Sequence, residues 1–91
     1  MNLKELQNEA HRIAREKGWW DEEKSIAKQL ALIHSEISEA LEDWRNGRMS
    51  IKFEDKKPVG FGIELADVLV RVGDLAEKLG IHLEKCVQVK I

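Results

Sequence analysis

Apolar residues recur every three or four positions over most of the chain, which is the spacing of helices that bury one face. Helices are predicted at residues 3–17, 22–46, 61–79 and 81–91. Asp21 can cap the second of these segments, and a glycine follows each of the first three, as is common at helix ends. The pattern therefore predicts an all-α protein of three long helices and a short C-terminal one.

Residues 47–59 interrupt this helical spacing. Ile51 and Phe53 alternate with polar residues, so a short extended stretch is possible there. A surface loop is the interpretation we favour for the whole segment.

The second predicted helix carries an apolar stripe whose members alternate three and four positions apart, as is typical of helix bundles. The stripe consists of Ile26, Leu30, Ile33, Ile37, Ala40 or Leu41, and Trp44. The third helix is apolar around most of its circumference, which predicts that it is buried. So few helices cannot cover it on all sides, so we expect a homodimer, or a dimer of dimers, to complete the bundle.

Composition and charge narrow the class of protein. The chain of 91 residues fits one domain, residues 1–91, and its formal net charge of -2 provides no basic field for polymeric nucleic acid. It lacks an apolar run long enough to cross a membrane, so we expect a soluble cytoplasmic protein without a membrane partner. Cys86 is the only cysteine, which excludes an internal disulfide, and we expect it to be a small core residue.

Two acidic pairs are the strongest candidates for chemistry: Glu36 with Glu39, and Glu64 with Asp67. Residues three apart share a helix face, so each pair directs two carboxylates to one side of its helix. Asp43 falls in the same sector as the first pair. If the second and third helices pack antiparallel, the pairs face each other and repel unless a cation lies between them.

The ligand type indicates which cation to expect. No histidine follows a glutamate by three residues, so a ferritin-like di-iron motif is absent. Ligation by oxygen alone favours Mg2+, with Mn2+ as the alternative. Farther along the third helix, Asp74 and Lys78 are interpreted as an ordinary solvated face that pairs its own charges.

A Mg2+ held by carboxylates is commonly shared with substrate phosphates, so a nucleotide polyphosphate is a natural substrate. The candidates to contact its base are Trp19, Trp20, Trp44 and Phe61, although aromatic residues more often pack in cores or dimer contacts.

Residues 32–42 and 62–71, with the flanking segments 17–21 and 80–85, resemble the MazG-like nucleotide pyrophosphohydrolases of the all-α NTP pyrophosphatase superfamily. The resemblance implies a Mg2+-dependent hydrolysis of a nucleoside triphosphate to the monophosphate and pyrophosphate, as in nucleotide-pool housecleaning. The residues that match the family's metal-binding carboxylates are Glu36, Glu39, Glu64 and Asp67. Glu39 would also orient or deprotonate the attacking water, and Lys90 matches a lysine that begins a substrate-binding motif.

The resemblance has two departures. Ser35 stands where family members often carry a further acid, and the asparagine and arginine that follow the motif lysine have no counterpart after Ile91. An alternative function therefore stays open, namely a non-catalytic helical module for nucleotide sensing or protein interaction.

Overall fold

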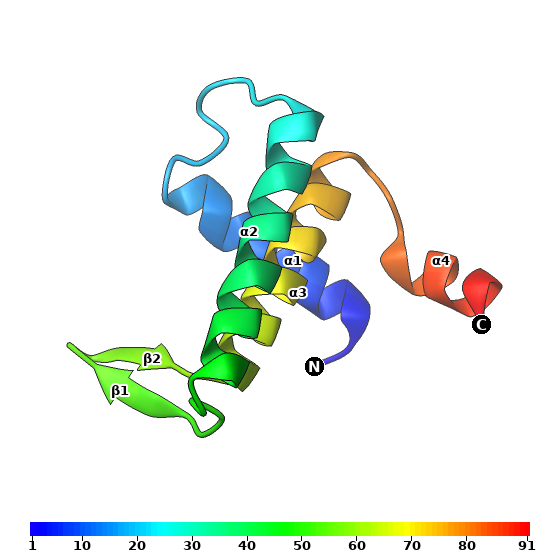
Figure 1. The fold of residues 1–91 in the computed structure, drawn as a ribbon. Helices are drawn as coiled ribbons and strands as arrows, with labels where there is room; N and C mark the ends of the chain where they lie inside the picture. The colour runs from blue at the N-terminus through cyan, green and yellow to red at the C-terminus, as the bar shows by residue number, and fades with distance from the viewer. The chain divides into compact units, whose positions relative to one another are not determined.

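Four helices and one small hairpin make up the chain (Figure 1). The computed structural model describes residues 1–91. The elements are α1 (Leu3–Glu16), α2 (Ile26–Arg45), β1 (Lys52–Glu54), β2 (Lys57–Val59), α3 (Phe61–Lys78) and α4 (Leu83–Lys90). The predicted mostly helical character is confirmed.

The chain divides into two compact units. The first contains residues 1–25 and 70–91, and the second contains residues 26–69. Helix α3 supplies its N-terminal half to the second unit and its C-terminal half to the first.

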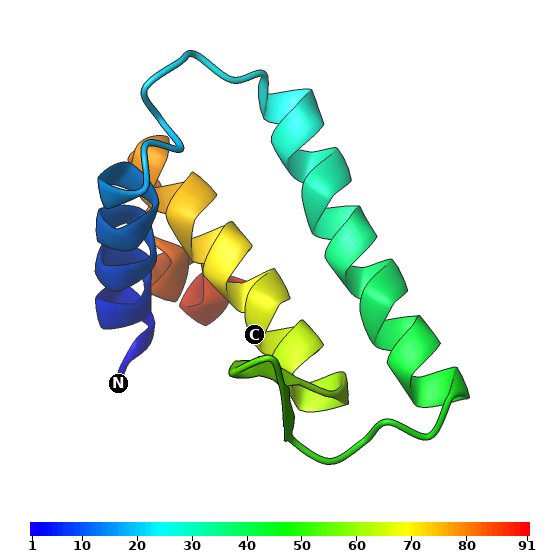
Figure 2. The same ribbon diagram turned by 90° about the vertical axis from the view of Figure 1, so that its left-hand side faces the viewer.

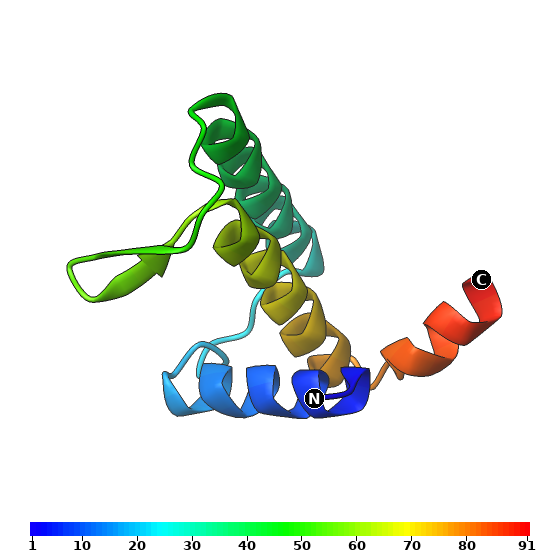
Figure 3. The same cartoon turned by 90° about the horizontal axis from the view of Figure 1, so that it is seen from below.

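In the first unit, α1 crosses the C-terminal half of α3 and also contacts α4 (Figure 3). Gly73 on α3 lies against α1, where a Cβ atom would meet the Gln7 Cα at 3.5 Å. Gln7 is fully buried at this crossing. Asn2 caps α1 by accepting a hydrogen bond from the Glu5 amide at 2.8 Å, which satisfies one free N–H of the first turn.

The segment after α1 departs from the sequence prediction. Residues 21–25 are not helical, and α2 begins at Ile26 instead of directly after Asp21. Tertiary contacts hold this connector, because Trp20 donates a hydrogen bond to Asp74 and Lys24 lies over the Trp19 ring. These contacts compete with helix formation, and no local sequence pattern reveals them.

Residues 52–59 form a hairpin, so the short extended stretch describes this part of the segment and the favoured surface loop was wrong for it. Strands β1 and β2 pair antiparallel, with Phe53 opposite Pro58. Asp55 and Lys56 at the turn both have positive φ, of 49° and 66°. A turn with two positive φ values normally carries Asn-Gly or Asp-Gly. This turn has neither dipeptide, so the sequence contains no hairpin signal.

In the second unit, α2 and the first half of α3 run in opposite directions (Figure 2). The backbone before α3 is fixed by a close approach: a Cβ on Gly60, whose φ is 127°, would lie 2.4 Å from the Ser50 carbonyl oxygen. The Phe61 amide donates to the Arg48 carbonyl oxygen at 2.8 Å. Only a glycine fits at position 60, so the hairpin leads into α3 in one fixed geometry.

The apolar stripe predicted to be a bundle seam is largely exposed in the single chain. Ala40 is buried, but Ile26, Leu30, Ile37, Leu41 and Trp44 are exposed. Cys86 is exposed as well, so its expected place in a core was wrong, because α4 has no fully buried residue. No helix in the structure combines the length and apolar character needed to cross a membrane.

Candidate metal centre

Carboxylates from α2 and α3 meet within the second unit. One oxygen each from Glu36, Glu64 and Asp67 lies within 4.8 Å of the others. Glu36 belongs to the middle of α2, and the other two belong to the first turns of α3. The antiparallel course of the helices therefore brings Glu36 together with acids that lie 28 and 31 positions later in the sequence.

The start of α3 explains why Glu64 tolerates this position. The Glu64 amide donates to the Gly60 carbonyl oxygen at 3.1 Å, which places the residue in the first turn of the helix. The N-terminal end of a helix carries a partial positive charge that favours a carboxylate. This charge offsets part of the repulsion within the cluster.

Electrostatics at Glu64 are unfavourable nevertheless. Burial, together with the neighbouring carboxylates of Glu39, Asp67 and Asp43, raises the pKa of the Glu64 carboxyl to about 7. Glu64 Oε2 is buried and accepts no hydrogen bond. A bound proton or a bound cation would relieve the unfavourable charge of a carboxylate in such a site near neutral pH.

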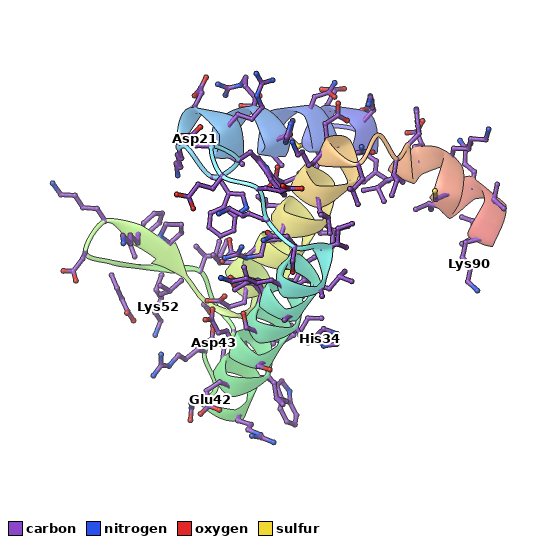
Figure 4. The ribbon with its side chains drawn as sticks, turned by 90° about the horizontal axis from the view of Figure 1, so that it is seen from above. Asp21, His34, Glu42, Asp43, Lys52 and Lys90 are labelled. Carbon is purple, nitrogen blue, oxygen red and sulfur yellow. The ribbon has the colours of Figure 1, made fainter.

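The donor set determines which cation would fit. Glu36, Glu64 and Asp67 offer oxygen only, and Glu39 lies close enough to act on Glu64. His34 is exposed and lies on the opposite side of α2 from Asp43 (Figure 4). Hard divalent cations such as Mg2+ and Mn2+ are the ones that an all-oxygen set would hold.

Asp43 was not among the metal-binding residues predicted from the sequence. It lies four residues after Glu39, on the same face of α2, and its charge contributes to the raised pKa of Glu64. The i,i+4 spacing was a visible signal for it. Glu36, Glu39, Glu64 and Asp67 are near one another, as the two acidic pairs predicted.

Asp74 belongs to a different cluster, in the first unit. The prediction that it lies on a solvated face of the third helix was wrong. Its Oδ1 accepts a hydrogen bond from Trp20 Nε1 at 2.8 Å and lies 2.8 Å from His11 Nδ1. Only 8% of Asp74 is exposed. The sequence pattern missed this cluster, since its partners come from α1 and the connector.

A cavity of about 580 Å3 opens beside His11. Its walls include Asn8, Arg15 and Trp20. This volume lies within the range of small-molecule sites. His11 had no signal in the sequence, because a lone histidine on a helix is usually structural.

The predicted substrate-binding residues Trp19, Trp20 and Lys90 all belong to the first unit, whereas the acidic cluster belongs to the second. The Trp19 ring is contacted by Lys24 at 4.7 Å and by Arg71 at 5.7 Å. Lys90 ends α4 and is exposed (Figure 4). Their contact with substrate stays a prediction.

Comparison with known proteins does not assign the acidic cluster to a family. Neither a family model, nor a curated protein, nor a solved structure matches the chain. The cluster is therefore interpreted from its own chemistry, together with the resemblance of its motifs.

Proposed function

We propose that the chain is a Mg2+-dependent nucleoside triphosphate pyrophosphohydrolase. The observation that carries this proposal is the meeting of Glu36, Glu64 and Asp67, with a buried Glu64 oxygen that no hydrogen bond satisfies. The resemblance of the two acidic motifs to the MazG-like enzymes supports the choice of reaction.

The acids would hold the metal and leave room for phosphate. Glu36, Glu64 and Asp67 are the expected ligands, and Glu39 borders them. Mg2+ at such a site neutralises phosphate charge and lowers the pKa of a bound water. The metal charge would offset both the burial and the carboxylate repulsion that together raise the Glu64 pKa.

The reaction adds the oxygen of one water to the α-phosphorus and breaks the bond from that phosphorus to the oxygen bridging to the β-phosphate. The products are the nucleoside monophosphate and pyrophosphate. Glu39 is exposed and adjacent to Glu64, so in this proposal it accepts the proton that the water loses. Trp19, Trp20 and Lys90 are proposed to contact the nucleotide.

The test is a screen of common and damaged (d)NTPs with Mg2+ that measures both pyrophosphate and the nucleotide product. Monophosphate together with pyrophosphate is the expected result, and diphosphate with inorganic phosphate would contradict the bond assignment. Glu39→Gln and Asp67→Asn should each lower the rate by about 100-fold or more while circular dichroism stays helical.

Glu42→Gln is the matched control, because Glu42 is an exposed acid of α2 outside the cluster. It should retain the rate of the unchanged chain. Full activity in both Glu39→Gln and Asp67→Asn would overturn the site. Nucleotide-dependent stabilisation without any monophosphate would instead identify the alternative, a non-catalytic nucleotide-sensing module.

A further inference from the structure

Positive charge is concentrated in the hairpin and the residues that lead into it. We call residues 48–59 the basic hairpin; its acids are Glu54 and Asp55, and its four exposed cations are Arg48, Lys52, Lys56 and Lys57. The segment therefore has a net charge of +2 in a chain whose net charge is -2, so the other residues together carry -4.

The cations of the basic hairpin differ from those of the first unit, which are paired within the chain. Arg12 binds both Glu9 and Glu16, and Lys4 binds Glu77 at 2.9 Å. No ion pair or side-chain hydrogen bond in the structure involves a cation of the basic hairpin. Their charge is therefore available to a bound anion.

The register of the two strands shows which of these cations act together. Lys52 is opposite Val59, and Lys57 is opposite Glu54. Residues paired across an antiparallel sheet share a face, and alternate residues of one strand share a face as well, so Lys52 and Lys57 lie on the same face. Lys57 has an acid directly across from it, whereas Lys52 has an apolar residue, so Lys52 carries the less compensated charge.

The basic hairpin belongs to the same unit as the acidic cluster and leads directly into α3. Gly60 fixes this joint, and Glu64 and Asp67 follow in the first turns of the helix. Figure 4 shows Lys52 and Asp43 on the same side of α2. Because Asp43 is near enough to act on the charge of Glu64, Lys52 lies on the side of α2 that carries the acidic cluster.

The proposed reaction creates a need for cations beside the metal centre. The ligands of the metal are carboxylates, which offset much of its charge before a phosphate arrives. When the bond to the α-phosphorus breaks, its electron pair stays on the bridging oxygen, so negative charge accumulates on the departing pyrophosphate. Lysine is a common phosphate ligand that acts as a point charge, and it can stabilise such a leaving group.

We propose that the basic hairpin, with Lys52 and Lys57 as its principal cations, binds the β- and γ-phosphates of the substrate and the pyrophosphate product. This inference rests on the proposed pyrophosphohydrolase function and names the part of the site that holds the leaving group. The acids bind the metal, and the two lysines contact the phosphates. Because the contact involves neither base nor sugar, it is the same for every nucleoside triphosphate.

Titration calorimetry with inorganic pyrophosphate in millimolar Mg2+ tests this contact directly. Lys52→Gln combined with Lys57→Gln should weaken pyrophosphate binding by about 10-fold or more, because two charge-assisted contacts are lost. Lys52→Arg combined with Lys57→Arg should keep the affinity, since both charges remain. Binding of a nucleoside monophosphate, which lacks the β- and γ-phosphates, should be the same in all these variants.

The matched control is Lys17→Gln combined with Lys85→Gln, which removes two exposed lysines outside the basic hairpin and changes the net charge equally. It should bind pyrophosphate as the unchanged chain does. An equal loss of affinity in the control would show an effect of net charge alone and would overturn the proposal. Stabilisation by Mg2+ without pyrophosphate should be the same in every variant, so a loss confined to pyrophosphate is assigned to the lysines and not to the metal ligands.

Kinetics separate this inference from the proposed function. If the unchanged chain releases monophosphate and pyrophosphate, the paired Gln substitutions at Lys52 and Lys57 should raise KM for the triphosphate by about 10-fold. An unaltered KM would overturn the role of the hairpin and leave the proposed function standing. If no nucleotide is hydrolysed, the proposed function fails, and calorimetry still decides about the hairpin: pyrophosphate binding that is absent, or equal with and without the two lysines, would overturn it.

Discussion

The two units treat their buried polar groups in opposite ways. In the first, Gln7 Nε2 donates to Glu77 Oε1 at 3.1 Å and to the Ile81 carbonyl at 2.8 Å, and its Oε1 accepts from the Leu83 amide at 2.9 Å. In the second, a buried oxygen of Glu64 accepts nothing, and its charged neighbours are carboxylates. The first arrangement is complete within the chain, whereas the second leaves a buried carboxylate oxygen without a hydrogen bond.

This contrast indicates which buried polar groups stabilise the fold. A buried group with all its hydrogen bonds made links the elements that bear its partners, as Gln7 links α1 to the turn between α3 and α4. A buried carboxylate among other carboxylates opposes folding. Residues that weaken the isolated chain in this way are candidates for binding.

Breaking the Gln7 network should have the largest effect on stability. Gln7→Leu removes three hydrogen bonds and leaves the Leu83 amide and the Ile81 carbonyl without the partner they have now. The expected loss is about 3–5 kcal/mol in the free energy of unfolding. Urea unfolding followed by circular dichroism measures it.

The control for this change is Gln88→Leu, an identical substitution at an exposed position of α4. It should alter stability by less than about 0.5 kcal/mol. Similar losses in the two variants would show that the network around Gln7 contributes little.

One glycine in each unit tests how strictly the backbone there requires a residue without a side chain. Gly60→Ala should destabilise by about 2–4 kcal/mol, because its φ of 127° is strained for alanine and the new Cβ would meet the Ser50 oxygen at 2.4 Å. Gly73→Ala should be neutral or stabilise by up to about 1 kcal/mol, since the new Cβ makes ordinary contacts in a helix. Thermal unfolding of both variants checks the sign. A tolerated Gly60→Ala would contradict the close approach that fixes the start of α3.

Neutralising Glu64 should stabilise the metal-free chain, which is the reverse of the Gln7 result. Glu64→Gln removes a charge from a site where burial and the Glu39 carboxylate oppose it. In EDTA at pH 8 we expect a gain of about 1 kcal/mol in the free energy of unfolding. The same variant should lose most of the stabilisation that millimolar Mg2+ gives the unchanged chain.

Glu42→Gln again serves as the control, and it should keep the Mg2+ effect and change stability by less than about 0.5 kcal/mol. A loss of stability for Glu64→Gln in EDTA would mean that the carboxylate is favourable without a cation. The proposed metal centre would then lose its electrostatic argument.

The fold was predictable where the pattern is local. Apolar spacing and glycines placed α1 and α3 within one residue of their observed ends. The start of α2 was misplaced because contacts of Trp19 and Trp20 hold the connector open. The hairpin was missed because its turn has Asp55 and Lys56 at positive φ and lacks the glycine that usually marks such a turn in a sequence.

The candidate site was predictable to the extent that helix periodicity orders side chains. Helix periodicity placed each acidic pair on one face of its helix. Antiparallel packing of α2 and α3 then brings Glu36 towards Glu64 and Asp67. The cluster of Asp74 with His11 and Trp20 depends on a crossing of helices that no local pattern encodes. Long-range side-chain contacts of that kind require the tertiary structure.

The pH dependence of stability should also distinguish the two units, and it is the smallest of the predicted effects. Burial and neighbouring acids raise the pKa of Glu64 from 4.5 to about 7. Between these pH values the metal-free folded state therefore binds more protons than the unfolded state. Because of this difference, stability falls as the pH rises from about 4.5 to 7. The hydrogen bond from Lys4 lowers the pKa of Glu77 below 4.5, so the stability that this residue provides is present above pH 4.5 and is lost as pH falls through its folded pKa. Melting temperatures in EDTA should therefore decline on both sides of about pH 4.5. Glu64→Gln should flatten only the neutral side and Glu77→Gln only the acid side, and an unchanged profile in Glu64→Gln would contradict the unfavourable charge at the metal centre.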